Sequence, residues 1–239
     1  MALDLAGYDV LTFDCYGTLI DWESGILAAL RPLLTRHGVA LSDDQVLEQF
    51  GALESHAELP PYRSYREVLA RVVDGFGQQH GFTPTPDERA ALAGSVPDWP
   101  AFPDTTAALK SLARQYKLAI LSNVDDDLFA GSARRLGVDF AAVVTAQQVG
   151  SYKPDPRNFA RAIERVGVSR ARLLHVAQSL FHDIAPAKAA GLATVWVNRR
   201  HDRPGFGATP PASAEPDLEV PDLATLARLV EAAPRPGDQ

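Results

Sequence analysis

Short apolar runs that end abruptly in polar residues recur along this chain, and they constrain its fold more than any other feature. Helix-like patterns separate the runs, so that strand and helix alternate. This alternation predicts an α/β fold with a parallel sheet and right-handed crossovers. Ligands of such sheets gather at the carboxyl ends of the strands, where this chain repeatedly places polar side chains. The predicted strands are residues 8–13, 118–121, 141–144, 173–176 and 194–197, with helices that include 105–115, 128–136, 158–166 and 184–190.

Residues 24 to about 99 break this alternation. They contain amphipathic helical stretches at 26–37, 44–56, 65–80 and 86–93 and no convincing strand. Pro-rich junctions around Pro97 and Pro103 mark the return to the alternating pattern. We therefore expect a helical cap, residues 21–99, inserted into a core made of residues 1–20 and 100–239. Further on, the sequence predicts a surface loop over 203–221, a closing helix over 223–232 and a frayed tail over 234–239.

Charge and composition exclude several classes of protein. The net charge of -7 offers no broad positive field for nucleic acid or an anionic membrane surface. One cysteine, Cys15, cannot form an internal disulfide or a thiolate metal cage, which suits a reducing compartment. The N-terminal residues lack the basic start of a secretory signal, and no apolar run is long enough to span a membrane. We expect a cytoplasmic protein.

The segment from Asp14 to Thr18 is the most informative part of the chain. Asp14 ends the first predicted strand, Gly17 allows a tight turn, and the Thr18 hydroxyl follows closely. A carboxylate presented in this way can act as a nucleophile. The alternative is a structural role, in which Asp14 caps a helix after a strand-to-helix turn.

Two later segments place polar groups where they can join Asp14. Ser122 and Asn123 supply a hydroxyl and an amide that can hold an anionic substrate oxygen, or they form an ordinary turn. Lys153 supplies an ammonium that can pair with Asp14 and stabilise charge in the transition state, or it is a solvated lysine.

The last polar segment runs from Gln178 to Asp183, where a helix begins. Ser179 or Asp183 can simply cap that helix. His182 is either a proton shuttle, because imidazole titrates near neutrality, or a residue of the first helical turn. Gln178 either positions a water molecule or supports the backbone.

These segments resemble, in the same order, the four sequence motifs of the haloacid dehalogenase superfamily. The resemblance covers residues 8 to about 229 and implies a Rossmann-like core with a helical cap inserted just after the nucleophile. That arrangement agrees with the insertion expected above. The matching stretches are Phe13 to Leu19, Leu121-Ser122-Asn123, Tyr152-Lys153-Pro154-Asp155, and Asp183 with Ala189-Ala190-Gly191.

Two positions point to one branch of that superfamily. Most members of that superfamily are Mg²⁺-dependent phosphatases, in which a second Asp, two positions after the nucleophile, protonates the leaving alkoxide. Here that position is Tyr16, so the Asp that would protonate an alkoxide is missing. A halide leaves without a proton, so dehalogenation does not need that Asp. Gln178 stands where the phosphatases carry a Mg²⁺-binding Asp, and a neutral amide is a weak ligand for a hard cation. The chain therefore resembles the L-2-haloacid dehalogenase branch.

This resemblance implies a mechanism and a set of site residues. Asp14 would attack the halogen-bearing carbon of a small 2-haloacid, and water activated near Lys153 and Asp183 would hydrolyse the resulting ester. Thr18 and Lys153 would orient Asp14. Substrate contacts are expected from Tyr16, Ser122, Asn123, Gln178, Ser179 and His182. We expect a small-molecule substrate, no metal or other cofactor, no nucleic acid or membrane partner, and, as in related dehalogenases, a homodimer.

The cap departs from the branch pattern. Its characterised members receive the halide with an Arg in the first half of the cap, where this chain has the neutral residues 49–52. Arg63 or Arg66 either reaches in from the next helix or is solvated. The aromatic residues Trp22, Trp99 and Phe102 either line an apolar pocket or pack in the core.

Two alternatives stay open. The spacing of Ser179 to Asp183 resembles the phosphatase pattern, which favours a Mg²⁺-dependent phosphatase acting on a small phosphorylated metabolite. The missing cap Arg and the missing metal ligand instead favour a binding protein that has lost turnover.

Overall fold

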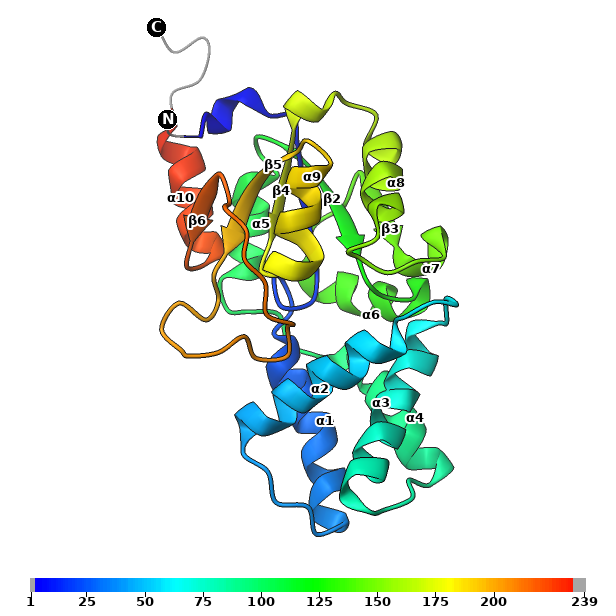
Figure 1. Ribbon diagram of the computed structural model, residues 1–239. Coiled ribbons are helices and arrows are strands. Elements are labelled where there is room, and N and C mark those ends of the chain that lie inside the picture. Colours follow the sequence, from blue (N-terminus) through cyan, green and yellow to red (C-terminus); the bar gives the residue numbers. More distant parts are fainter. Residues whose placement is uncertain (1–2, 234–239) are drawn as a thin grey trace, which may run out of the picture.

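The chain folds into a parallel sheet with helices on both faces and a separate group of helices at one end (Figure 1). The computed structural model describes residues 3–233, so the predicted tail over 234–239 lies outside the described residues. The strands follow the order β3-β2-β1-β4-β5-β6, and every neighbouring pair is parallel. Their bounds are β1 Val10–Phe13, β2 Lys117–Ser122, β3 Ala142–Thr145, β4 Leu173–Ala177, β5 Ala193–Val197 and β6 Leu218–Val220.

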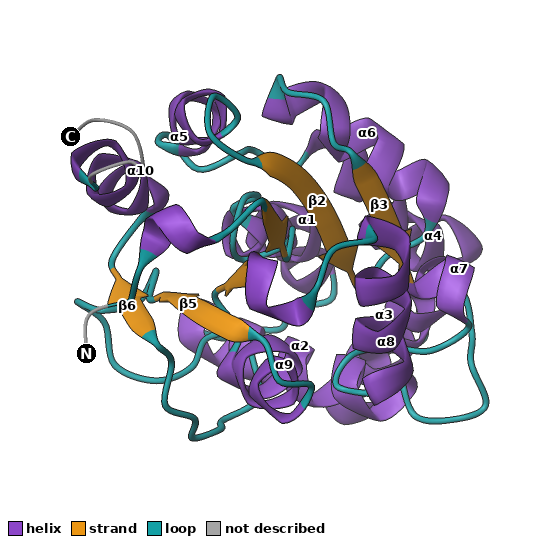
Figure 2. Cartoon of the chain, turned by 90° about the horizontal axis from the view of Figure 1, so that it is seen from above, coloured by secondary structure: helices purple, strands orange, loops and turns teal. Residues whose placement is uncertain are grey.

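Both faces of the sheet are covered, as the continuous apolar runs predicted. All four residues of β1 are buried. Leu11 and Phe13 face a core that includes residues of α5 and α10, while Val10 faces a second core with residues of α8 and α9. Figure 2 shows these two pairs of helices on opposite sides of the strands. The core helices are α5 Thr105–Leu112, α6 Asp126–Leu136, α7 Ala146–Val149, α8 Pro156–Val166, α9 Ala185–Ala189 and α10 Leu223–Ala232.

The predicted helical insertion is also confirmed. It follows β1 and lies at the end of the sheet where the strands finish (Figure 1). Two of its helices begin with a capping box, which Ser42 forms with Gln45 and Thr85 forms with Glu88. The helices of the cap are α1 Trp22–Arg36, α2 Asp43–Ala57, α3 Tyr65–His80 and α4 Pro86–Ser95.

Two connections join the insertion to the core, and they lie side by side. Ile20 forms an antiparallel bridge with Ala101, and the Asp21 backbone N–H donates to Pro100 O at 2.8 Å. This paired crossing supports the cap limits of residues 21–99, which stay a prediction.

The prediction for residues 203–221 is wrong in part. A short strand, β6, pairs with β5 in this stretch, and its register joins Val195 to Leu218. The loop before it is also not wholly on the surface, because Ala208 and Thr209 are buried. This loop packs on the cap: an added Cβ at Gly51 of α2 would lie 2.4 Å from Ala208 O.

Among the described residues, no helix combines the length and the apolar character needed to cross a bilayer.

Candidate active site

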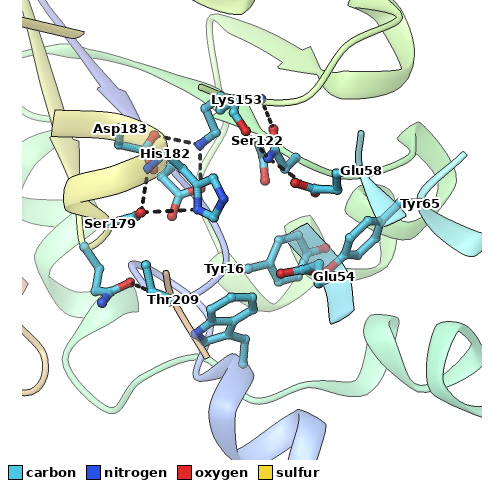
Figure 3. A pocket seen from close by; sticks show the side chains of 14 residues that line it. Tyr16, Glu54, Glu58, Tyr65, Ser122, Lys153, Ser179, His182, Asp183 and Thr209 are labelled. Atoms are coloured by element: carbon cyan, nitrogen blue, oxygen red, sulfur yellow. Dashed lines mark hydrogen bonds and ion pairs between the residues drawn. The ribbon is translucent and has the colours of Figure 1, made fainter. Parts of the chain in front are cut away.

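A narrow pocket of about 30 Å³ lies where the carboxyl ends of β1, β2 and β4 meet the cap (Figure 3). Asp14 follows β1, Ser122 ends β2 and Gln178 follows β4, so the crossover topology brings together residues far apart in sequence. The lining residues are Asp14, Tyr16, Trp22, Glu54, Glu58, Tyr65, Ser122, Asn123, Lys153, Gln178, Ser179, His182, Asp183 and Thr209.

Both oxygens of the Asp14 carboxyl group have a hydrogen-bond partner. Thr18 Oγ1 donates to Asp14 Oδ2 at 2.7 Å, and the same hydroxyl accepts from the Gln178 backbone N–H at 2.9 Å. Because the hydroxyl has one proton, accepting from Gln178 leaves that proton for Asp14. Burial raises the pKa of Asp14, and the Lys153 ammonium opposes that shift.

Lys153 is buried, at 1% exposure, and all three of its ammonium protons have an acceptor. Its Nζ lies 2.9 Å from Asp14 Oδ1, 2.7 Å from Asp183 Oδ1 and 3.0 Å from Leu121 O. Burial alone would lower the pKa of Lys153, but Asp14 and Asp183 raise it above its usual value. One cation therefore compensates two buried carboxylates.

Asp183 is supported from behind by a histidine that the sequence reasoning missed. His175 of β4 is fully buried, and its Nε2 lies 3.0 Å from Asp183 Oδ1, while Nδ1 lies 3.0 Å from Thr12 Oγ1. Burial alone would raise the pKa of Asp183, but Lys153 and His175 hold it below its usual value. Asp183 Oδ2 is buried without a partner in the described structure, so it is free to accept from a water molecule.

A π-helical turn, Leu180–Ile184, brings His182 and Asp183 to the pocket. Single π turns are frequent at functional sites because they insert one residue into a helix start and redirect its side chains. Ser179 Oγ accepts from the His182 backbone N–H at 2.8 Å and so caps this turn. Burial lowers the pKa of His182 to about 4, so the imidazole is neutral at neutral pH.

Ser122 and Asn123 differ in how much of each side chain is free. Ser122 Oγ is buried without a partner in the described structure. Asn123 lines the pocket, but its Oδ1 accepts from the Lys153 backbone N–H at 2.7 Å and its Nδ2 donates to Lys153 O at 3.1 Å. Asn123 thus fixes the segment that carries Lys153, and its contact with a substrate stays a prediction.

Tyr16 and Gln178 line the pocket with their polar ends engaged elsewhere. The Tyr16 hydroxyl pairs with Ser132 Oγ at 2.9 Å, and burial raises the pKa of Tyr16 well above its usual value. The side-chain oxygen of Gln178 accepts from Thr209 Oγ1 at 3.2 Å. Neither residue therefore offers an acidic proton to a leaving group.

The cap contributes an acidic face that the sequence reasoning missed. Glu54 of α2 and Glu58, the C-cap residue one turn later, both line the pocket. The Tyr65 hydroxyl donates to Glu54 Oε1 at 2.6 Å, and Asn123 Nδ2 lies 3.5 Å from Glu58 Oε1. Burial raises the pKa of Glu54 to about 7, and burial together with Glu54 raises the pKa of Glu58.

The arginines suggested for the cap do not line this pocket. Arg63 donates to backbone carbonyls of its own loop and Arg66 pairs with Asp127 on the core. Of the three aromatic residues, Trp22 lines the pocket. Trp99 is buried against the edge of Tyr16, and Phe102 stacks under the Arg199 guanidinium.

The donor set does not fit Mg²⁺. Asp14 and Asp183, the core carboxylates nearest the expected metal position, already share the Lys153 ammonium. Gln178 supplies only a neutral amide oxygen, a weak ligand for a hard cation, and that oxygen already accepts from Thr209. Within residues 3–233 no cluster of three or more His, Cys, Asp or Glu side chains has a geometry that would hold a metal ion.

A parallel sheet that presents an ammonium-paired carboxylate beneath an inserted helical cap defines a class of capped α/β proteins. The sequence profile described as haloacid dehalogenase-like hydrolase matches residues 8–191, and the chain belongs to this family of hydrolases.

Known relatives include both dehalogenases and phosphatases. Haloacetate dehalogenase H-2 of Moraxella sp. (strain B) is 26% identical over 225 residues, which cover 93% of this chain and 97% of that protein. Validoxylamine A 7'-phosphate phosphatase of Streptomyces hygroscopicus subsp. limoneus is 29% identical over 222 residues, covering 90% and 94%. The solved L-2-haloacid dehalogenase of Xanthobacter autotrophicus superposes with a TM-score of 0.75 at 25% identity, covering 95% of this chain and 100% of that one.

Proposed function

We propose that this chain is a metal-independent hydrolase that cleaves a carbon–halogen bond in a small 2-haloacid or a close derivative, with Asp14 as the nucleophile. The observation that carries the proposal is the contact of the Lys153 ammonium with both Asp14 and Asp183. This pairing keeps a buried carboxylate ionised without a divalent ion.

The first chemical step is a displacement at carbon. A carboxylate oxygen of Asp14 forms a bond to the halogen-bearing carbon, and the carbon–halogen bond breaks with both electrons passing to the halide. Thr18 and Lys153 fix the orientation of Asp14 during this step. The Ser122 hydroxyl, which has no partner in the described structure, binds a carbonyl oxygen of the substrate.

The second step hydrolyses the Asp14 ester and regenerates the free enzyme. A water molecule gives a proton to Asp183 Oδ2 and attacks the carbonyl carbon of the Asp14 ester. The bond between that carbon and the substrate oxygen then breaks, the hydroxylated product takes the proton from Asp183, and the Asp14 carboxyl group releases its own proton to solvent. The net reaction consumes one water and releases one halide and one proton.

The lack of an acid at position 16 favours a halide leaving group over an alkoxide. A phosphate monoester needs an acid to protonate its alkoxide, and the engaged Tyr16 hydroxyl occupies that position. The phosphatase alternative is favoured by its relative at 29% identity and by the Ser179-to-Asp183 spacing. It requires Mg²⁺, for which the donors present do not fit.

Halide release in the presence of a chelator tests the proposal. We expect chloride from 2-chloropropanoate or 2-chloropropanamide with EDTA present, and none from Asp14→Asn. Asp127→Asn, a change at an exposed surface carboxylate, is the matched control and should keep activity. Turnover of phosphate esters alone, and only with Mg²⁺, would establish the phosphatase instead.

A binding protein that has lost turnover would release neither chloride nor phosphate.

The cytoplasmic location and the homodimer stay predictions. Light scattering tests whether the chain forms a homodimer.

A further inference from the structure

The acidic face of the cap meets the core at the place where a substrate carboxylate was expected to bind. Figure 3 shows Glu58 beside Ser122, with Glu54 and Tyr65 next to it. Glu54 is 3% exposed. Glu58 reaches within 3.5 Å of Asn123 Nδ2, so its carboxyl group lies against the Ser122-Asn123 segment.

The pocket has no free positive charge to offset these groups. Of the described residues that line it, Lys153 alone carries a permanent positive charge, and its three protons are bound to Asp14, Asp183 and Leu121 O. His182 is neutral at neutral pH because burial lowers its pKa to about 4.

The arginines of the β5–β6 loop do not supply the missing charge. Arg199, Arg200 and Arg203 line a neighbouring pocket and not this one. Arg199 pairs with Asp104 at 2.8 Å and Arg200 pairs with Glu23 at 2.7 Å.

With Asp14 and Asp183 ionised against Lys153, the lining carries one net negative charge when Glu54 and Glu58 are both neutral, and more when either ionises. A substrate carboxylate brought here would lose its hydration and meet like charge at low dielectric. An uncharged group of the same shape avoids both penalties.

We infer that the pocket selects a 2-halo carboxamide, an uncharged amide with a halogen on the adjacent carbon, over the corresponding 2-haloacid. This inference rests on the proposed function and names its substrate class. Ser122 Oγ donates to the amide carbonyl oxygen, and Glu58 accepts from the amide N–H₂. Both requirements suit an amide, since it carries one acceptor and two donors where a carboxylate carries acceptors only.

A matched pair of substrates tests the inference. 2-Chloropropanamide and 2-chloropropanoate share carbon skeleton and leaving group and differ in charge and hydrogen-bond donors. We expect kcat/KM for chloride release at pH 7.5 to be at least about tenfold higher for the amide. An equal or higher value for the acid overturns the inference and leaves the proposed function standing. Chloride release from neither compound overturns both.

A variant separates charge selection from a structural role of α2. Glu58→Gln removes the charge and keeps the shape, so we expect the preference for the amide to shrink at least about fivefold, with a gain for the acid. Glu48→Gln, on the exposed side of α2, should leave kcat/KM unchanged for both substrates. Equal effects of Glu58→Gln on both substrates, with an unchanged melting temperature, would overturn the assigned contact.

Discussion

Replacing Lys153 with methionine removes the one ammonium that compensates Asp14 and Asp183. Methionine keeps an unbranched side chain of similar length, so packing changes little while two buried carboxylates lose their partner. The Lys153 side chain is 1% exposed, and those of Asp14 and Asp183 are 9% and 1% exposed. Water therefore cannot readily replace the lost contacts.

The distances give the size of the effect. Coulomb's law at 2.9 Å, the distance from Lys153 Nζ to Asp14 Oδ1, gives about 6 kcal/mol with an effective dielectric constant of about 20. Losing this attraction raises the pKa of Asp14 further, because burial already raises it and the Lys153 ammonium opposes that shift. Removing one partner of a buried pair costs about 3–5 kcal/mol of folding free energy.

The sign of the pH dependence follows from these shifts. In the variant, the folded-state pKa of Asp14 lies above its unfolded value, so the loss of stability is present at neutral pH and fades as pH falls toward the unfolded pKa. In the wild type, the pKa of Asp183 is lowered, so its stabilising contribution is lost over the same acidic range. The difference in unfolding free energy between the wild type and Lys153→Met should therefore become smaller as pH falls.

Urea unfolding at pH 7.5 and pH 5, together with a pH–rate profile, measures both effects. We expect a loss of about 3–5 kcal/mol at pH 7.5, a smaller loss at pH 5, and activity that rises with increasing pH as Asp14 ionises. Lys188→Met breaks an ion pair of 2.7 Å with Asp217 near the surface and should cost at most about 1 kcal/mol with full activity. A Lys153→Met variant as stable and as active as Lys188→Met would refute the reasoning.

Three further outcomes follow from single contacts. Thr18→Val removes the hydrogen bond to Asp14 Oδ2 and should lower kcat/KM about 10–100-fold, whereas Thr18→Ser should restore most of it; equal rates for both variants would contradict the contact. His182, with a pKa near 4, should show no NMR titration between pH 5.5 and 8, and its burial should destabilise the fold as pH falls below about 6.5; a midpoint near 6.5 would be the contrary result. Gly51→Ala places a Cβ 2.4 Å from Ala208 O and should lower the free energy of unfolding by about 1–3 kcal/mol in a thermal melt. Gly94→Ala, with open space around it, should leave the stability unchanged or raise it. A Gly51→Ala variant as stable as the wild type would show that the loop does not pack there.

The core was predictable because its signals are local. Strands buried on both faces need apolar residues throughout, and β1, β2, β4 and β5 therefore stood out as short apolar runs. β6 was missed because its three residues, Leu-Glu-Val, lie at the sheet edge and bury only Val220 fully. Its pairing with β5 is a tertiary contact that leaves little pattern in so short a segment.

The core side of the site was predictable for a related reason. Polar residues at the carboxyl ends of parallel strands lie at one edge of the sheet, so Asp14 and Asp183 were expected there together. Lys153 follows α7 and not a strand, and it was predicted as the ammonium that pairs with Asp14. His175 gave no comparable signal, because it lies inside a buried strand rather than at its end.

The cap side was missed because docking of the cap on the core is not encoded in local periodicity. One sign was present. Glu54 continues the apolar stripe of α2 formed by Val46, Leu47 and Phe50, and a carboxylate on such a stripe has to find a polar partner or a site. Glu58, one turn later, extends the same face into the pocket.

A single-turnover reaction in heavy-oxygen water tests the central claim, a covalent bond between Asp14 and the substrate. With enzyme in excess over 2-chloropropanamide or 2-chloropropanoate, mass spectrometry of the peptide that contains Asp14 should show one heavy oxygen in its carboxylate, and the product hydroxyl should carry the ordinary isotope. Heavy oxygen in the product and none in that peptide would mean that water attacks the substrate directly, and the account would be wrong.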